Sequence, residues 1–364
     1  MPDIEALLRT GAHLHYTWPR KRTNAMDEPS LEDLRRRAKS GDAAAMTALA
    51  KHALRNPDKP IAPAEGVAML MDAAGRGDAE ATALRATLAG VGLGMAPSWP
   101  AALDHLQRAA ELGWEAAQIQ LALLASDRDL AARAERGDHD DTIWRHLRAS
   151  IDIAPWATRN FPRRIAAKPL IGELAGFLSP SICDWLIARA QSGAVRARIY
   201  DPETGAHNVG DDRTNSAYEF DIVAADVLLL LIREKIAAVF GVPATFALES
   251  TNILHYAVGQ QFAPHVDYFD PVKPAFAEQI ATGGQRVVTF LVYLNEGYEG
   301  GETAFPLVGT IYKGRKGDAM FFMNVDQATG APDTNTRHAG MPPTRGEKWI
   351  LSQWVRGSPK PRPR

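Results

Sequence analysis

The segment from Phe262 to Asp267 contains the side chains best suited to hold a metal ion, because His265 and Asp267 stand two positions apart in it. Its pattern predicts a β-strand, and side chains two apart on a strand point to the same face. Both side chains can therefore reach one ion. A His-x-Asp pair is common by chance, so the assignment depends on a further ligand elsewhere in the chain.

His338 is the candidate for that further ligand, since it stands just before the last predicted strand. Two histidines and one carboxylate on one face of iron(II) leave coordination positions open, and this is the ligand set of the non-haem iron oxygenases. Taken alone, His338 has an ordinary surface histidine as its alternative. A different metal in the same site also stays open, because affinity alone would favour zinc or copper.

Lys348 begins the last predicted strand, which is otherwise apolar. A buried lysine is costly unless a carboxylate neutralises it, so this position suggests an anionic cosubstrate. Ile350, Ser352 and Trp354 lie on the same strand face and would line the same pocket. Thr289, a lone hydroxyl in another apolar strand, could join Lys348 in holding a carboxylate. A hydrogen bond from Thr289 to its own backbone is the alternative.

The elements that position these residues follow from the patterns after residue 165. Ser179 followed by Pro180 has the form of an N-cap with proline at the first helical position, so a helix is predicted there, and another over 228–240. Short β-rich runs follow at 252–258, 262–267, 286–294, 318–323 and 348–355. Segment 269–284 is predicted to be a lid loop near the metal. Helices first and strands afterwards indicate an α+β domain with a sheet sandwich or barrel.

The N-terminal half carries an internal repeat with a period of 36 residues. Gly41, Gly77 and Gly113 occupy equivalent positions, and an aspartate follows the first two. A glycine can adopt the left-handed conformation that ends one helix, and the aspartate can cap the next, so each unit predicts a helix, a turn and a helix. Stacked units form an α-solenoid. About three units resemble Sel-like repeats, relatives of tetratricopeptide repeats, which act either as a scaffold that holds a partner or as a packing module of the enzyme.

These patterns divide the chain into an N-terminal segment (1–29), Sel-like α-helical repeats (30–150), a linker (151–164), the domain with the candidate site (165–358) and a C-terminal tail (359–364). The net charge of −2, with both signs mixed along the chain, gives no indication of a nucleic-acid partner. No apolar run approaches the ~20 residues of a membrane span. The single cysteine, Cys183, is expected to be a buried core thiol and favours a reducing, cytoplasmic location.

Motifs spread along residues 165 to 358 resemble the catalytic domain of prolyl 4-hydroxylase-type iron(II) and 2-oxoglutarate dioxygenases. The similar segments are Leu174–Ser179, Arg213–Ser216, His255–Gln260, Pro264–Asp267, Gly284–Thr289, Tyr293–Asn295, Gly300–Pro306, Lys316–Ala319 and Gly346–Trp349. Segment 269–284, Arg337 immediately before His338, and the Sel-like N-terminus depart from the family's pattern. These departures fall where the substrate would be selected.

The resemblance implies a double-stranded β-helix domain, of jelly-roll or cupin-like form, with flanking helices and preceded by the all-α solenoid. The residues it assigns are His265, Asp267 and His338 as Fe(II) ligands; Lys348, Thr289 and Tyr256 at 2-oxoglutarate; and Trp354 on the substrate side. Tyr268 and Arg337, which stand beside the candidate ligands, are further candidates for the substrate side. The implied reaction uses O2 to hydroxylate a C–H bond, releases succinate and CO2, and takes ascorbate as a reductant.

The expected substrate is a residue of a protein or peptide, with proline the first candidate, brought in with help from the repeats. Two alternatives stay open. The chain could hydroxylate a free amino acid or another small metabolite. Outside the enzymes, it could be a repeat scaffold with a vestigial oxygenase domain, although the complete set of candidate ligands and the lysine argue against decay.

Overall fold

The computed structural model describes residues 29–56, 61–94, 96–138, 140, 142–200 and 207–357, and the structural statements below concern these residues. Contacts divide the chain into a helical unit, Met1–Thr158 with Phe220–Lys235, and a sheet unit, Arg159–Glu219 with Ile236–Arg364. Residues 220–235, placed in the catalytic domain by the sequence patterns, thus group with the helical unit. The predicted C-terminal tail, and all but residue 29 of the predicted N-terminal segment, lie outside the described residues.

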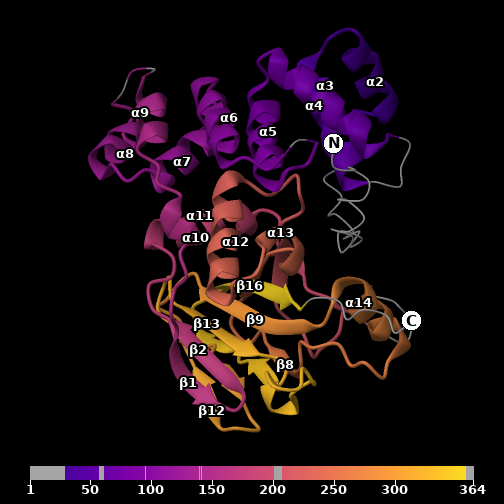
Figure 1. Cartoon of the computed structure of the whole chain (residues 1–364), viewed down its shortest axis with the longest axis vertical. Helices are drawn as coiled ribbons and strands as arrows, with labels where there is room; N and C mark the ends of the chain where they lie inside the picture. Colours follow the sequence, from indigo (N-terminus) through magenta and orange to yellow (C-terminus); the bar gives the residue numbers. More distant parts are fainter. Residues whose placement is uncertain are drawn as a thin grey trace. The chain divides into compact units, whose positions relative to one another are not determined.

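The helical unit is built from short helices joined by tight turns (Figure 1). They are α2 (Leu31–Lys39), α3 (Ala43–Arg55), α4 (Pro63–Gly75), α5 (Ala79–Val91), α6 (Trp99–Glu111), α7 (Glu115–Leu124), α8 (Arg128–Glu135), α9 (Ile143–Ala149) and α10 (Ala154–Ala157). The first part of α12 (Val227–Phe240) belongs to the same unit. Helices α3, α5 and α7 begin at the predicted 36-residue spacing. The predicted helical character of this region is confirmed, and its kinship with Sel-like repeats stays a prediction.

The turn inside each repeat has the predicted chemistry. The φ angles are 92° at Gly41, 87° at Gly77 and 86° at Gly113, in the left-handed region that glycine tolerates. The carboxylate of Asp42 accepts from the N–H of Ala45 at 3.1 Å, and that of Asp78 accepts from the N–H of Ala81 at 2.7 Å. Each aspartate therefore caps the helix that follows it. In the third repeat Trp114 takes this place without a side-chain cap.

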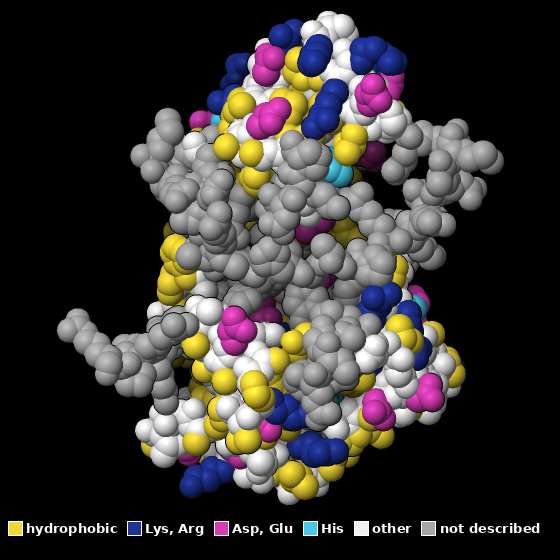
Figure 2. All heavy atoms as spheres, turned by 90° about the vertical axis from the view of Figure 1, so that its right-hand side faces the viewer, with side chains coloured by type: hydrophobic (Ala, Val, Ile, Leu, Met, Phe, Trp, Pro, Cys, Tyr) yellow, Lys and Arg dark blue, Asp and Glu magenta, His cyan; other side chains and the backbone are white. Residues whose placement is uncertain are grey.

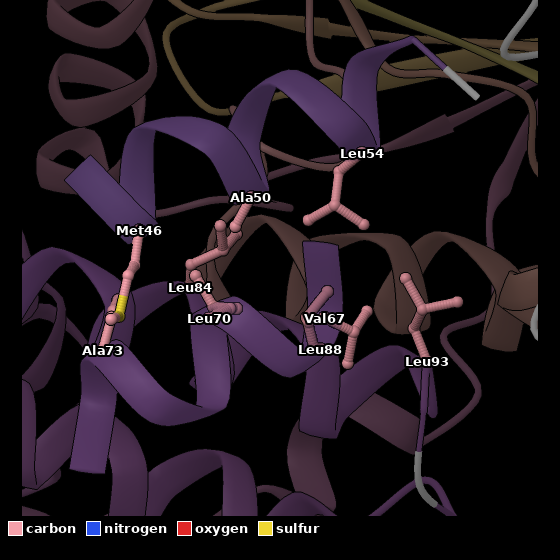
Figure 3. Packing of buried hydrophobic residues seen from close by; sticks show 10 residues of the cluster. Met46, Ala50, Leu54, Val67, Leu70, Ala73, Leu84, Leu88 and Leu93 are labelled. Atoms are coloured by element: carbon pink, nitrogen blue, oxygen red, sulfur yellow. The ribbon is translucent and has the colours of Figure 1, made fainter. Parts of the chain in front are cut away.

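Small side chains let these helices pack closely. Figure 3 shows the apolar core between α3, α4 and α5, formed by Met46, Ala50, Leu54, Val67, Leu70, Ala73, Leu84, Leu88 and Leu93. A Cβ added at Gly66 would lie 2.6 Å from the Cβ of Ala53. The backbone of α4 thus approaches α3 so closely that only glycine fits there.

The strands of the sheet unit pair in antiparallel fashion and form several sheets (Figure 1). The eight-stranded sheet has the order β1 (Arg163–Ala167), β2 (Leu170–Leu174), β13 (Ala319–Met323), β9 (Arg286–Tyr293), β16 (Lys348–Arg356), β7 (Asn252–Tyr256), β6 (Ser216–Glu219) and β3 (Val195–Arg196). The four-stranded sheet has the order β12 (Thr310–Tyr312), β11 (Thr303–Phe305), β14 (His338–Gly340) and β8 (Phe262–His265). Two small pairs are β10 (Glu299–Gly300) with β15 (Pro343–Arg345), and β4 (Ile199–Tyr200) with β5 (His207–Asn208). The predicted α+β class, with a jelly-roll sheet domain, is confirmed.

The five predicted strand runs coincide with β7, β8, β9, β13 and β16, and the predicted helices with α11 (Pro180–Gln191) and α12. The prediction of a loop over 269–284 is wrong for its second half, because α14 (Pro274–Gly283) forms there. Pro274 suits the first helical turn, and Gly284, at φ 79°, ends the helix. The strands β1 to β6, β10, β11, β12, β14 and β15 were not predicted. The remaining short elements are α13 (Ala244–Ala247) and η2 (Thr334–Thr336).

The core of the sheet unit lies between its two larger sheets. Its buried members are Ile171, Leu291, Tyr293, Phe305, Tyr312, Met320, Phe322 and Ile350. Cys183 is buried on α11, as predicted. Within the described part of the chain, no helix has both the length and the apolar character needed to cross a bilayer. Figure 2 shows acidic and basic side chains interspersed on the face drawn there, in keeping with the mixed charge of the sequence.

Candidate metal centre and cosubstrate pocket

The register between β8 and β14 places two histidines side by side. His265 ends β8, His338 begins β14, and the two are paired across these antiparallel strands. Asp267 follows His265 by two residues. The candidate ligand atoms of the three side chains all lie within 4.8 Å of one another. Among the described residues, no other group of three His, Cys, Asp or Glu side chains is arranged in this way.

Hydrogen bonds decide which ring nitrogen each histidine turns toward the centre. Nδ1 of His265 lies 2.9 Å from the carbonyl oxygen of Ala263, and Nδ1 of His338 lies 3.0 Å from that of Thr336. A carbonyl can only accept, so each Nδ1 carries the proton and each Nε2 keeps its lone pair. The Nε2 atoms lie 3.5 Å and 3.6 Å from the carboxylate oxygens of Asp267.

A hydroxyl orients the buried carboxylate of Asp267. Thr289 Oγ1 donates to Asp267 Oδ2 at 2.6 Å, and Asn324 Nδ2 donates to Thr289 Oγ1 at 2.9 Å. All three side chains are buried, so this chain of bonds restricts the carboxylate to one orientation. The role predicted for Thr289 beside Lys348 at the cosubstrate stays a prediction, and the structure adds its bond to Asp267.

Burial and mutual charge set the protonation states of this centre. Burial lowers the pKa of His338 to about 4, and the neighbouring His265 acts in the same direction. Burial alone would raise the pKa of Asp267, but His338, His265 and the Thr289 hydroxyl together hold it well below its ordinary value. At neutral pH the centre therefore presents a neutral His338 and an ionised Asp267, which are the states that bind a metal.

Lys348 is a buried cation on the wall of the same pocket. It is only 1% exposed and is paired with Tyr256 across strands β16 and β7. Its Nζ lies 5.1 Å from the ring centre of Tyr256 and 5.6 Å from that of Tyr293. Within the described residues, Nζ has no hydrogen bond or ion pair.

This environment suits a bound anion. Burial lowers the pKa of Lys348 to about 7, while the charge of Glu302 acts in the opposite direction. The two tyrosine faces offer weak cation–π attraction and no countercharge. Since an ammonium group without a partner is costly to bury, a carboxylate of the ligand would supply the missing charge.

One pocket brings most of the predicted residues together. It is lined by Arg213, Leu254, Tyr256, Phe262, His265, Asp267, Thr289, Leu291, Thr303, His338, Gly340, Lys348, Ile350, Ser352 and Trp354. The predicted shared face of Lys348, Ile350, Ser352 and Trp354 is confirmed by this lining. Tyr256 is buried, and burial raises the pKa of its phenol to about 12, so it stays a neutral donor.

Two predicted substrate residues do not line this pocket. Arg337 is exposed, and Tyr268 is half-buried away from the lining. Tyr268 directly follows Asp267, and Arg337 directly precedes His338. Neighbouring residues of an extended chain point to opposite sides, so these two side chains point away from the ligands. Their assignment to the substrate side therefore has no support from the structure.

Comparison with known proteins agrees with this geometry. Residues 251–356 match the family model of the 2OG-Fe(II) oxygenase superfamily. Prolyl 4-hydroxylase 1 of Arabidopsis thaliana is 35% identical over 209 residues, which cover 54% of this chain and 71% of that protein. Prolyl 4-hydroxylase 2 of the same plant is 31% identical over 215 residues, covering 53% of this chain and 69% of that protein. This chain belongs to the prolyl 4-hydroxylase-like 2OG-Fe(II) oxygenases.

The oxygenase is thus a 2-oxoglutarate-dependent dioxygenase that uses Fe(II), 2-oxoglutarate and O2. Among solved structures, the 2OG complex of the viral collagen prolyl hydroxylase vCPH from Paramecium Bursaria Chlorella virus-1 is 27% identical, covers 52% of this chain and 96% of that chain, and has a TM-score of 0.39. The residues present fit these cofactors, because two Nε2 lone pairs, one carboxylate and a buried lysine that has no partner among the described residues share one pocket.

Six lining residues of the oxygenase were not singled out as site residues from the sequence: Arg213, Leu254, Phe262, Leu291, Thr303 and Gly340. Phe262 stacks on His265 with ring centroids 3.4 Å apart, and the guanidinium of Arg213 lies 4.5 Å from the ring centre of Phe262. Thr303 accompanies them in the lining and bonds the hydroxyl of Tyr293 at 2.8 Å. Arg213 and Thr303 lie within motifs that carried the family resemblance, so that signal could have found them.

A charged network supports the Trp354 side of the pocket in the oxygenase. The Arg286 guanidinium lies 3.7 Å from the Trp354 ring centre and makes two bonds to Glu249, at 2.8 Å and 2.7 Å. Arg356 joins Glu249 at 3.0 Å and also donates to the carbonyls of residues 279 and 283, at the end of α14. This network therefore links the wall at Trp354 to the segment predicted as a lid.

Proposed function

We propose that His265, Asp267 and His338 bind the Fe(II) of this dioxygenase, that Lys348 binds the distal carboxylate of 2-oxoglutarate, and that the substrate is a prolyl residue of a protein or peptide. The observation that carries the site assignment is that a cluster of three candidate ligands shares one pocket with a buried lysine that has no partner among the described residues. The substrate class is supported by the similarity to prolyl 4-hydroxylases.

The chain's own residues then have separate tasks. When bound, Fe(II) and 2-oxoglutarate would supply the chemistry by which O2 hydroxylates a C–H bond of the substrate, with 2-oxoglutarate converted to succinate and CO2. The Nδ1 bonds of the histidines keep both Nε2 atoms available as ligands. Leu254, Leu291 and Ile350 line the pocket with apolar surface that excludes water. Trp354, stacked on Arg286, forms the wall next to which the substrate would lie.

The substrate class can be tested with the wild-type protein, Fe(II), ascorbate, O2 and 2-oxoglutarate. We expect a poly-L-proline peptide to raise succinate formation about tenfold or more above the rate without substrate, since an oriented substrate couples the reaction, with hydroxyproline formed in equal amount. Free L-proline is the matched control and should leave the rate unchanged. Equal stimulation by free proline would instead identify a small-molecule hydroxylase.

The role of Thr289 predicts a measurable loss of iron affinity. In Thr289→Val the bond to Asp267 is lost without a change of shape, and the loss of such a supporting bond typically weakens metal binding about 10–100-fold. Titration with Fe(II) under anaerobic conditions measures this effect. Thr289→Ser keeps the hydroxyl and should bind as the wild type does. If the valine variant also binds normally, the hydroxyl has no part in orienting the carboxylate.

Docking of a protein substrate on the helical repeats stays a prediction, as does a cytoplasmic location. Both rest on the sequence alone, the first on the repeat pattern and the second on the single cysteine.

A further inference from the structure

Residues 220–235 contact the same helix of each successive repeat. Asp221 meets Arg55 at the end of α3, Ala225 meets Thr87 on α5, and Leu228 meets Gln120 on α7. The order of contacts along the segment follows the order of the repeats along the chain. Stacked repeats present a continuous surface of this kind to a ligand.

The first contact is an ion pair. Arg55 Nε lies 2.7 Å from Asp221 Oδ2, with both side chains partly exposed. The other oxygen of Asp221 accepts from the N–H groups of Val223 and Ala224, at 2.9 Å and 2.7 Å. Asp221 therefore shapes the turn of the segment and binds the first repeat with the same carboxylate.

The next two contacts are hydrogen bonds between buried side chains and the segment's backbone. Thr87, 2% exposed, donates to the carbonyl of Ala225 at 3.3 Å. Gln120, 3% exposed, accepts from the N–H of Leu228 at 3.1 Å, while its amide nitrogen bonds Ala116 of its own helix. The first N–H groups of a helix have no partner within it, so α7 supplies one to the start of α12.

Apolar packing accompanies these bonds. Ile222 and Val223 pack against the core cluster of α3, α4 and α5 shown in Figure 3. A Cβ added at Gly90 of α5 would lie 2.8 Å from Cδ1 of Leu230. Leu230 thus occupies the space that a side chain at position 90 would need.

We propose that the face formed by α3, α5 and α7 is an intramolecular docking site whose ligand is the segment from Asp221 to Leu230 of the same chain. Helix α12 continues from this segment to Phe240, which packs edge-on against Phe290 and Phe321 in the sheet unit. The repeats therefore hold a part of the oxygenase's own chain, and this face is not available to an external protein substrate. The exchange measurements below are independent of the substrate, whereas the comparison of KM values rests on the proposed prolyl substrate.

The test compares full-length wild type with Gly90→Val by hydrogen exchange and by peptide kinetics. We expect amide exchange over residues 221–230 to accelerate at least about tenfold, because the new side chain takes the space of Leu230. Adding Leu230→Ala in the same chain should restore part of the protection. The KM for a prolyl peptide should stay within about twofold of wild type, since no substrate binds there.

Arg55→Met provides a milder variant in case Gly90→Val does not fold. Exchange at Val223 and Ala224 should accelerate several-fold, whereas Arg76→Met, which breaks an exposed pair with Asp72 in the same unit, should leave both amides unchanged. Unchanged exchange over the segment in the variants would overturn the proposal. A rise in peptide KM without any change in exchange would overturn it too, and would identify this face as a substrate-docking surface.

Discussion

A Lys348→Met variant is expected to need at least about 30-fold more 2-oxoglutarate for half-maximal succinate formation than the wild type. Removing one partner of a buried charge pair costs about 2–5 kcal/mol, and each 1.4 kcal/mol is about a tenfold change in affinity. The side chain of Lys348 is buried and finds no partner among the described residues, so the ligand's carboxylate supplies the countercharge. Succinate formation without a prime substrate measures the effect.

The pH dependence of the KM for 2-oxoglutarate provides a second, independent test of Lys348. Because burial lowers the pKa of Lys348 to about 7, the ammonium form that attracts the anion is lost as the pH rises through that value. The KM for 2-oxoglutarate should therefore increase above pH 7 in the wild type, and this increase should be absent in Lys348→Met. Lys316→Met is the matched control, because Lys316 pairs with the exposed side chain of Asp184 and does not line the pocket. A similar loss in both lysine variants would refute the assignment.

Replacing a metal ligand should have the largest effect of all. In His265→Ala and in Asp267→Ala, Fe(II) affinity is expected to fall by more than about 100-fold, beyond the 10–100-fold typical of a supporting residue, and succinate formation should drop to background. The reason is that the described residues offer three candidate ligands at this centre, whose atoms lie within 4.8 Å of one another. Iron bound per chain after gel filtration, together with turnover, measures the loss.

The control for this experiment is His255→Ala. His255 lies on β7, bonds Glu347 at 2.8 Å and stacks on Trp349, and does not line the pocket. It should keep iron and turnover close to the wild-type level. If His265→Ala retains full iron content while remaining folded, the metal ligands have been assigned to the wrong residues. If His255→Ala loses iron to the same degree, the effect belongs to the fold and not to the centre.

The family assignment rests on the C-terminal part of the chain and does not account for the repeats. Residues 251–356 carry the oxygenase match, whereas the relatives cover only about half of the chain. The helical unit lies mostly outside that half, so its role has to come from its own contacts. Those contacts are made with residues 221–230, and they favour a packing module over a free scaffold.

The sequence by itself determined the features that depend on neighbours in the chain. The spacing of His265 and Asp267 predicted that both reach one ion, and the alternation of the last strand sets Lys348 beside Ile350 and Trp354. Strand β8 ends at His265, so Asp267 reaches the centre from the segment that follows the strand. The glycines of the repeat turns and the capping aspartates were predictable for the same reason, since a turn and a cap are decided within four residues.

Only the tertiary structure decided what depends on pairing between distant strands. His338 meets His265 through the register of β8 with β14, and Thr289 meets Asp267 across segments 22 residues apart. That contact gave Thr289 a partner that no local pattern indicates. The exclusion of Tyr268 and Arg337 from the pocket and the packing of residues 220–235 with the repeats have the same origin. Side-chain direction and long-range packing are set by the whole fold, because each contact competes with every alternative that the chain could form.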